Sequence, residues 1–234
     1  MKHFLLYLVL VAGFYIGDLK SQELNDTLSI EIPTRAKSRI VCVGGLISVG
    51  KSTFISKVKD WCVAHGYSCK VMDEIKSLSM LESQAENITA TVGFYFGHRV
   101  QMAIDAPEVA KNYDLVIMER SHLDHLAFVQ AMEKVSLLSK GSAKWTERAI
   151  EDVDPPDPVT FVYLSVPPEI AMERQVQRGD GYEDIFTLEF TKELDYAYRS
   201  ILKGKYSNPI FLDWINFGEE YDFDELIKEV FLAN

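Results

Sequence analysis

Residues 45–52 read Gly45-Leu46-Ile47-Ser48-Val49-Gly50-Lys51-Ser52 and fit the pattern G-x-x-x-x-G-K-[ST]. The apolar run 39–43 precedes this stretch, and apolar residues at helical spacing follow it. A glycine-rich loop between a strand and a helix offers backbone N–H groups to phosphates. In such a loop Lys51 would reach the β- and γ-phosphates, and the Ser52 hydroxyl would bind Mg²⁺. The stretch therefore predicts a phosphate-binding loop.

The rest of the chain alternates short apolar runs with longer segments of helical period, which is typical of a parallel α/β sheet. Helices are predicted over 170–178, 186–202 and 223–232, whereas the proline-rich segment 141–158 is predicted to be a loop. Together with the phosphate-binding loop, this order predicts a P-loop NTPase fold, with a five-stranded parallel sheet, helices on both faces and an arginine-bearing lid. The strands are expected near residues 39–43, 68–73, 115–118, 160–165 and 210–213.

Composition limits the class of protein. The chain has 234 residues, of which 47% are apolar and 25% charged, and these values exclude disordered, collagen-like and multi-span membrane proteins. Acidic residues outnumber basic ones by 35 to 24, so no broad basic surface is expected and no nucleic-acid partner is predicted. The three cysteines are too few and too irregularly spaced for a disulfide framework or a four-ligand zinc site, and we interpret them as reduced thiols.

The N-terminal segment 1–37 is expected to lie outside one folded domain that spans 38–234. Residues 4–16 form an unbroken run of apolar or small residues, which is too short to span a bilayer and is shaped like a signal peptide. No small-x-small cleavage site follows, so secretory or membrane routing stays open, and membrane contact is expected only if this run is an anchor. A phosphate-binding loop of this kind uses a nucleotide such as ATP, and both ATP and reduced thiols are plentiful inside cells. An intracellular location, cytoplasmic or mitochondrial, is therefore the preferred hypothesis.

Glu119 and Arg120 come directly after the third predicted strand, at the carboxyl edge of the sheet where open α/β folds bind ligands. A carboxylate at this edge would hold the metal ion, directly or through water, and a guanidinium would face phosphate charge. The alternative is an ordinary surface ion pair.

Arg174 and Arg178 are four residues apart, so they share one helix face, and a break at 179–181 follows them. This arrangement suits a lid whose arginines close on phosphates, although a solvated basic face has the same pattern. At the end of the second strand, Asp73 and Glu74 offer a carboxylate that would accept the proton of an attacking hydroxyl. A charged turn is the alternative there.

Taken in order, these motifs resemble the deoxyribonucleoside kinases over residues 38–232. The similarity rests on residues 45–53 with Thr53 included, the Glu119-Arg120-Ser121 triplet, the run 162–169, the Arg174-x-x-x-Arg178 pair, and Glu183 with residues 188–190. It implies phosphorylation of the 5′-hydroxyl of a deoxyribonucleoside by ATP and Mg²⁺, a step of nucleotide salvage. It also implies a homodimer formed through the regions 88–106 and 123–137.

Position by position, the resemblance implies a role for each motif. Lys51 and Ser52 would serve the phosphates and Mg²⁺, and Glu74 would be the general base. Glu119 and Arg120 would act beside the reacting phosphate and the 5′-hydroxyl. Arg174 and Arg178 would be lid arginines, Glu183 would hold the sugar 3′-hydroxyl, and residues 213–216 would form the loop that contacts adenine.

The sequence also departs from the family pattern. Phe96 matches the aromatic residue that precedes the base-reading glutamine, but Gly97 stands at the position of the glutamine itself. Gln101, about one helical turn further on, is the candidate substitute, and the preferred base stays unassigned. Three other family residues are missing, an acidic residue at Gly44, a proline at Ile75 and a third lid arginine at Asp180.

Two other functions remain open at this point. A thymidylate-kinase-like nucleoside monophosphate kinase is one, because Leu126-Ala127-Phe128 after Glu119-Arg120 keeps the spacing of that family. A nucleotide-binding protein that has lost turnover is the other. The carboxylates of Asp73 and Glu74 favour a neutral hydroxyl over a monophosphate, because like charges repel by about 4 kcal/mol at roughly 4 Å and an effective dielectric constant of about 20.

Overall fold

The computed structural model describes residues 39–73, 88–151, 153, 159–179, 186–205, 209–214 and 223–228. Within this part of the chain, five parallel strands form one sheet in the order β2-β3-β1-β4-β5. The predicted five-stranded parallel sheet is therefore confirmed. Its strands are β1 (Arg39–Gly45), β2 (Cys69–Met72), β3 (Leu115–Glu119), β4 (Val159–Ser165) and β5 (Ile210–Asp213).

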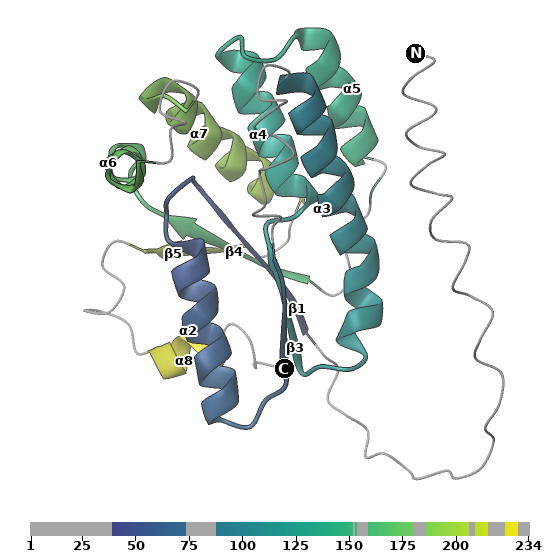
Figure 1. Cartoon of the computed structure of the whole chain (residues 1–234), viewed down its shortest axis with the longest axis vertical. Coiled ribbons are helices and arrows are strands. Elements are labelled where there is room, and N and C mark those ends of the chain that lie inside the picture. The colour runs from purple at the N-terminus through teal and green to yellow at the C-terminus, as the bar shows by residue number, and fades with distance from the viewer. Residues whose placement is uncertain are drawn as a thin grey trace, which may run out of the picture. The chain divides into compact units, whose positions relative to one another are not determined.

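Helices cover both faces of this sheet, as predicted. Figure 1 shows α2 and α8 on one side of β1 and β3, and α3, α4 and α5 on the other. Helix α4 packs against α3, α5 and α7, and α6 packs against α7. The helices are α2 (Lys51–Ala64), α3 (Ile88–Ala110), α4 (His122–Lys134), α5 (Lys140–Glu151), α6 (Pro168–Arg178), α7 (Leu188–Lys205) and α8 (Phe223–Ile227).

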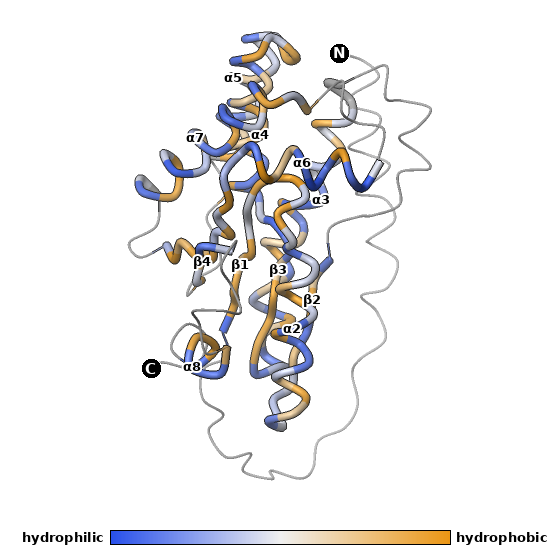
Figure 2. Tube along the Cα trace, turned by 90° about the vertical axis from the view of Figure 1, so that its left-hand side faces the viewer, coloured by the Kyte–Doolittle hydropathy of each residue, from blue (hydrophilic) through white to orange (hydrophobic). Residues whose placement is uncertain are grey.

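The two central strands are hydrophobic because both of their faces are covered. Strand β3 is buried at every position, and β1 is buried from Ile40 onward, so their sequences are mostly apolar. Figure 2 shows both strands in orange, the colour of hydrophobic residues, over most of their length. Helix α4 is buried nearly all round, because three other helices surround it. A single core results, and it fixes the carboxyl ends of β1 and β3 beside each other.

Helix α8 docks on α2 through aromatic and polar contacts. The indole Nε1 of Trp61 donates to Asp224 Oδ1 at 2.7 Å, and the rings of Phe54 and Phe223 meet edge to face at 6.3 Å. The C-terminal end of the described chain therefore supports the helix that begins at the phosphate-binding loop.

The predicted loop over 141–158 is wrong in its first part, because α5 occupies Lys140–Glu151. Ser139 begins this helix: its hydroxyl accepts from Ser142 N at 3.2 Å, and its carbonyl accepts from Ala143 N at 2.9 Å. Ala143 and Ile150 then bury a narrow stripe. The stripe is short and the prolines come just after it, so composition favoured a loop over the whole segment.

The proposed leader and several other segments lie outside the described residues. These segments include 1–37 and the part of the predicted last helix beyond Lys228. The asparagines of two Asn-x-Thr motifs, the sequence pattern that accepts N-linked glycans, also lie outside the described residues, Asn25 in Asn25-Asp26-Thr27 and Asn87 in Asn87-Ile88-Thr89. Among the helices that the structure describes, none is both long enough and apolar enough to cross a bilayer.

Candidate active site

The phosphate-binding loop joins β1 to α2, as its sequence predicts. Gly45, Ser48 and Gly50 all have positive φ, at 145°, 57° and 98°. Gly50 forms the N-cap of α2 in the left-handed region, where its carbonyl accepts from Phe54 N at 3.0 Å. A Cβ on Gly50 would also lie 2.6 Å from the indole nitrogen of Trp214. Both the backbone angle and the neighbouring ring require glycine at the point where the helix begins.

Lys51 folds its side chain back over this loop. Its Nζ donates to the carbonyl of Leu46 at 2.8 Å and approaches that of Gly45 at 3.5 Å, and the residue is only 7% exposed. The ammonium group therefore sits beside the loop backbone, where it is positioned to meet phosphate oxygens.

Ser52 and Glu119 meet although they are far apart in the sequence. The Ser52 hydroxyl donates to Glu119 Oε1 at 3.0 Å, from the first turn of α2 to the end of β3. Hydroxyl and carboxylate oxygens suit Mg²⁺, so this pair fits the predicted metal site. No group of three or more histidine, cysteine or acidic residues that could hold a metal occurs among the described residues. Nucleotide phosphates and water are the usual further ligands of Mg²⁺ at a site that holds the ion with one or two protein groups.

Arg120 turns back from β3 onto the phosphate-binding loop. Its φ of 67° is unusual for a residue with a side chain, and its backbone N donates to Val43 O at 3.0 Å. Nη1 of its guanidinium donates to Gly45 O at 3.2 Å. Cζ of the guanidinium lies over the ring of Phe128, 4.8 Å from the ring centroid.

The two predicted lid arginines reach the same loop from α6. Arg174 Nη1 donates to Val49 O at 3.3 Å, and Arg178 Nη1 lies 3.4 Å from Ser48 Oγ. Both side chains come from one face of the helix, as their spacing predicts, and the helix ends at Gly179 with a φ of 65°. The structure therefore brings Lys51, Ser52, Glu119, Arg120, Arg174 and Arg178 together around residues 45–50.

Two predicted site residues, Glu74 and Glu183, lie outside the described residues, as do the departures Ile75 and Asp180. Asp73 is described. It is exposed and follows β2 directly, and its carbonyl lies 3.4 Å from His98 Nε2. Because β2 pairs in parallel with β3, Asp73 lies at the same carboxyl edge of the sheet as Glu119.

The two residues predicted to contact the base, Phe96 and Gln101, lie on different faces of α3. Phe96 packs against His125, with ring centroids 5.7 Å apart. Gln101 instead is exposed and donates to Asp105 on the same helix at 2.8 Å. Residues five apart differ by roughly 140° around a helix with about 100° per residue, so Phe96 and Gln101 occupy different faces. Gln101 therefore does not share the face of Phe96, and its contact with the base stays a prediction.

Sequence reasoning missed a buried pair beside Phe96. Arg99 Nη1 lies 3.1 Å from His125 Nδ1, and both residues are buried. A guanidinium only donates, so Nδ1 of this histidine is the acceptor in the contact. The three-residue spacing from Phe96 to Arg99 was a usable signal, because it places both residues on one helix face.

A second feature that sequence reasoning missed explains why position 44 is a glycine where the family has an acidic residue. A Cβ on Gly44 would lie 2.7 Å from Phe161 Cζ and 2.8 Å from Asp124 Oδ1, distances that leave no room for a side chain. A carboxylate from α4 therefore occupies the space beside β1. Asp124 itself accepts from the hydroxyl of Tyr198 at 2.7 Å.

Trp214 is the second residue of the predicted adenine-contacting loop, residues 213–216. Its backbone N donates to Ser165 O at 2.9 Å and its ring meets Phe54 edge to face at 5.3 Å. Asn216 and the residue before it lie outside the described residues. Trp214 thus holds the end of β5 against the start of α2.

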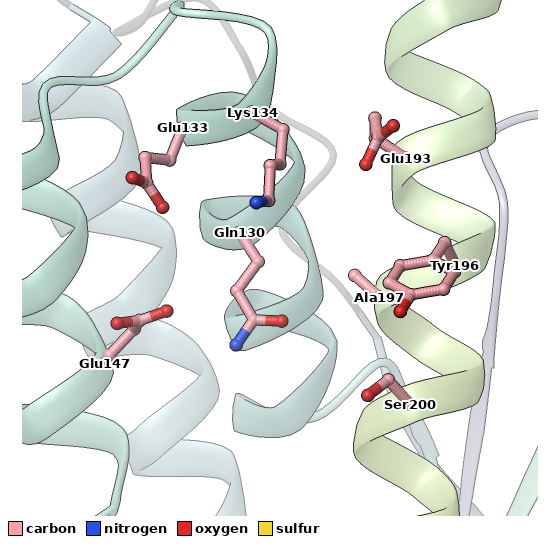
Figure 3. A pocket seen from close by; sticks show the side chains of 8 residues that line it. All are labelled: Gln130, Glu133, Lys134, Glu147, Glu193, Tyr196, Ala197 and Ser200. Carbon is pink, nitrogen blue, oxygen red and sulfur yellow. The ribbon is translucent and has the colours of Figure 1, made fainter.

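A separate surface pocket of about 270 Å³ lies between α4, α5 and α7 (Figure 3). No residue of the phosphate-binding loop and no predicted site residue lines it, so it is distinct from the candidate active site. Its lining consists of Gln130, Glu133, Lys134, Glu147, Glu193, Tyr196, Ala197 and Ser200.

Comparisons with known proteins agree with this geometry. A curated deoxyguanosine kinase from Dictyostelium discoideum is 24% identical over 217 residues, which cover 88% of this chain and 74% of the relative. A deoxyadenosine kinase from M. mycoides, solved with dCMP and dCDP, superimposes with a TM-score of 0.61 at 19% identity, over 82% of this chain and 96% of that one. With bound dATP the corresponding values are 0.62, 20%, 83% and 100%. These structural likenesses show the fold.

A family-model match over most of the chain shows which family the protein belongs to. The family model for deoxynucleoside kinase matches residues 41–231, which include every predicted site residue. The chain belongs to the deoxynucleoside kinase family.

Proposed function

We propose that this protein transfers the γ-phosphoryl group of ATP to the 5′-hydroxyl of a deoxyribonucleoside. The observation that supports this proposal most strongly is the convergence of Lys51, Arg120 and the Ser52–Glu119 pair on one loop. Phosphoryl transfer needs positioning and neutralisation of charge more than covalent chemistry, and these groups supply both. Arg174 and Arg178 add two further cations from the lid.

We propose Ser52 and Glu119 as the residues that hold Mg²⁺. The ion would neutralise charge on the bound phosphates. The hydroxyl is anchored on the first turn of α2 and the carboxylate on β3, so the sheet fixes the separation between them. Ser52 would bind the ion directly, and Glu119 would bind it directly or through water.

We propose Glu74 as the general base for the 5′-hydroxyl and Glu183 as the partner of the 3′-hydroxyl. The position of Asp73 at the carboxyl edge of β2 supports the first assignment, because Glu74 is the next residue in the sequence. The base of the nucleoside would lie against Phe96, close to the buried Arg99–His125 pair.

A single screen tests the proposed reaction. The four deoxynucleosides and their 5′-monophosphates are incubated with ATP, with and without Mg²⁺, and the products are separated by chromatography. We expect at least one deoxynucleoside to be converted to its monophosphate, and conversion to stop when EDTA removes the metal. Turnover of monophosphates alone would instead identify a nucleoside monophosphate kinase, and ATP binding without any turnover would identify a protein that has lost catalysis.

We also propose that the protein forms a homodimer in which α3 takes part. Phe94 and Ile104 on α3 are 42% and 62% exposed, and apolar side chains of this size on one helix suit contact with a second copy. Most of α4 is buried within the chain, so the predicted region 123–137 has less surface to contribute. Light scattering at several concentrations should give the mass of a dimer, and a monomer at every concentration would contradict the proposal.

We propose an intracellular location for the enzyme. Use of ATP supports this location, and the structure describes Cys42, Cys62 and Cys69 as free thiols, which suit a reducing compartment. Mass spectrometry of the native protein tests it, because a glycan on Asn87 would place the chain in the secretory route.

A further inference from the structure

Behind the guanidinium of Arg120 lies a buried chain of hydrogen bonds that the proposed reaction does not use. Arg120 Nη1 donates to the Tyr198 hydroxyl at 2.9 Å, and this hydroxyl donates to Asp124 Oδ1 at 2.7 Å. Asp124 Oδ1 also lies 3.9 Å from the same Nη1. The three residues are at most 5% exposed, so water does not screen their charges.

The direction of each bond in this chain is fixed. A guanidinium has no acceptor, so the Tyr198 oxygen accepts from Arg120 and its one proton must go to Asp124. Burial and the charge of Asp124 raise the pKa of Tyr198 well above its ordinary value, so the hydroxyl keeps that proton. Arg120 is thereby tied to a carboxylate on α4 through a hydroxyl on α7.

Asp124 is itself held in place by the start of α4. Its Oδ2 accepts from Ser121 N at 2.7 Å and from the Ser121 hydroxyl at 3.0 Å, and Ser121 caps the helix in return. The carboxylate thus has one oxygen on the helix cap and the other on Tyr198. Its position is set by backbone geometry.

These contacts fix the orientation of Arg120 against the phosphate-binding loop. Nη1 has two N–H groups, and the structure shows bonds from this nitrogen to the Tyr198 hydroxyl and to Gly45 O. Two bonds from one nitrogen, together with the ring of Phe128 4.8 Å from Cζ, leave the guanidinium little freedom to move. The positive φ of Arg120 is a strained backbone state of the kind that persists where surrounding contacts enforce it, often at functional sites.

We propose that Asp124 and Tyr198 are positioning residues that hold the Arg120 guanidinium in the orientation needed for phosphoryl transfer. This inference rests on the proposed function, in which Arg120 faces the reacting phosphate. Tyr198 acts only through Arg120, so its loss should slow the chemical step without weakening the binding of either substrate.

The chain offers a matched control for Tyr198. Tyr163 is another fully buried tyrosine, and its hydroxyl likewise donates to an aspartate, Asp195, at 2.7 Å. Asp195 pairs with Arg199, which donates to Ser165 and not to the phosphate-binding loop. Tyr163→Phe and Tyr198→Phe each remove one buried hydroxyl that donates to an aspartate, and only the second bond leads to Arg120. The acceptor Asp195 is partly exposed, whereas Asp124 is buried. The ring of Tyr163 packs on that of Tyr198, with centroids 5.0 Å apart, and both variants keep the aromatic ring.

The experiment compares the steady-state kinetics and urea unfolding of the two variants of the full chain. We expect Tyr198→Phe to lower kcat about tenfold, because a small misplacement of a catalytic group costs up to about 10²-fold. The KM values for ATP and for the deoxynucleoside should stay within about twofold, which is the signature of an interaction felt in the transition state. Tyr163→Phe should leave kcat within about twofold while lowering stability to a similar extent. Equal losses of kcat in both variants, or none in Tyr198→Phe, would overturn the inference.

A double-mutant cycle with Arg120→Ala separates the inference from the proposed function. Arg120→Ala should lower kcat by roughly 10² to 10³, and adding Tyr198→Phe to it should cause no further loss. A further tenfold loss in the double variant would show that Tyr198 acts independently of Arg120. If Arg120→Ala is as active as the natural protein, the role assigned to Arg120 in the proposed function is wrong. If Arg120→Ala is slow and Tyr198→Phe is fully active, the role of Arg120 stands and only the positioning role of Tyr198 is wrong.

Asp124→Asn provides a second route to the same answer. It removes the charge that orients the Tyr198 proton and keeps the size of the side chain. We expect a fall in kcat with unchanged KM values, as for Tyr198→Phe. A fall in kcat that disappears when rates are corrected for the folded fraction would overturn the positioning role.

Discussion

Replacing Lys51 by alanine should lower kcat by about 10³ or more and leave the fold intact. The ammonium group is held over the loop by the carbonyls of Leu46 and Gly45, where bound phosphates would otherwise meet uncompensated negative charge. Removing one such preorganised donor typically costs about 10² to 10³ in kcat, and Lys51 bears a full charge in addition. Initial rates with saturating nucleoside and ATP, measured with the circular dichroism spectrum, test this expectation.

Lys59→Ala is the control for this change. Lys59 lies on the same helix and is exposed, so its removal changes the net charge by the same amount without touching the loop. We expect its rate to match that of the natural protein. Retention of more than about a tenth of the natural turnover by Lys51→Ala would contradict the role assigned to the loop, because a bound phosphate should depend far more strongly on this charge.

Changing Glu74 to glutamine should reduce phosphorylation of deoxynucleosides by roughly 10² to 10⁴ in kcat, with ATP binding nearly unchanged. The amide keeps the size of the side chain and most of its hydrogen bonding, but it no longer accepts the proton of the 5′-hydroxyl. A monophosphate substrate should respond in the opposite direction, because removal of a negative charge relieves its repulsion. The change in rate caused by Glu74→Gln should therefore be a decrease for a deoxynucleoside kinase and an increase for a nucleoside monophosphate kinase. Measuring both substrates with both proteins distinguishes the two classes.

Asp73→Asn completes this comparison. If Glu74→Gln is as fast as the natural protein while Asp73→Asn is slow, the base is Asp73 and the alignment of the second strand must shift by one residue. If neither change slows the reaction with deoxynucleosides, a carboxylate base at the end of β2 is ruled out.

Much of the candidate site was predictable because open α/β folds bind their ligands at the carboxyl edge of the sheet. Parallel strands all end at one edge of a sheet, so Ser52 after β1 and Glu119 at the end of β3 had to lie near each other once the strands were placed. The same reasoning placed Arg174 and Arg178 on one helix face. Spacing within a helix or position at the end of a strand was enough for each of these residues.

The contacts that were not predicted join residues from different helices and strands, and no pattern in the local sequence marks such residues. Asp124 and Tyr198 are brought together by the packing of α4 against α7, and no periodicity in either helix indicates which residues will meet. The role of Gln101 as a substitute for the missing glutamine stays a prediction, because the four-residue spacing from Gly97 places the two positions within roughly 40° of each other around the helix. Helix α5 was missed because its buried stripe is narrow and the cap at Ser139 was not used.

The close approach of Gly44 to Asp124 and Phe161 also couples a substitution on β1 to a residue on α4. A side chain at position 44 and the carboxylate of Asp124 compete for the same space, so a larger residue at position 44 has to displace Asp124 Oδ1 or the ring of Phe161. Displacing the carboxylate would take the anion away from Tyr198 and Arg120. We therefore expect a substitution at position 44 to act on the candidate active site at a distance, through the orientation of Arg120.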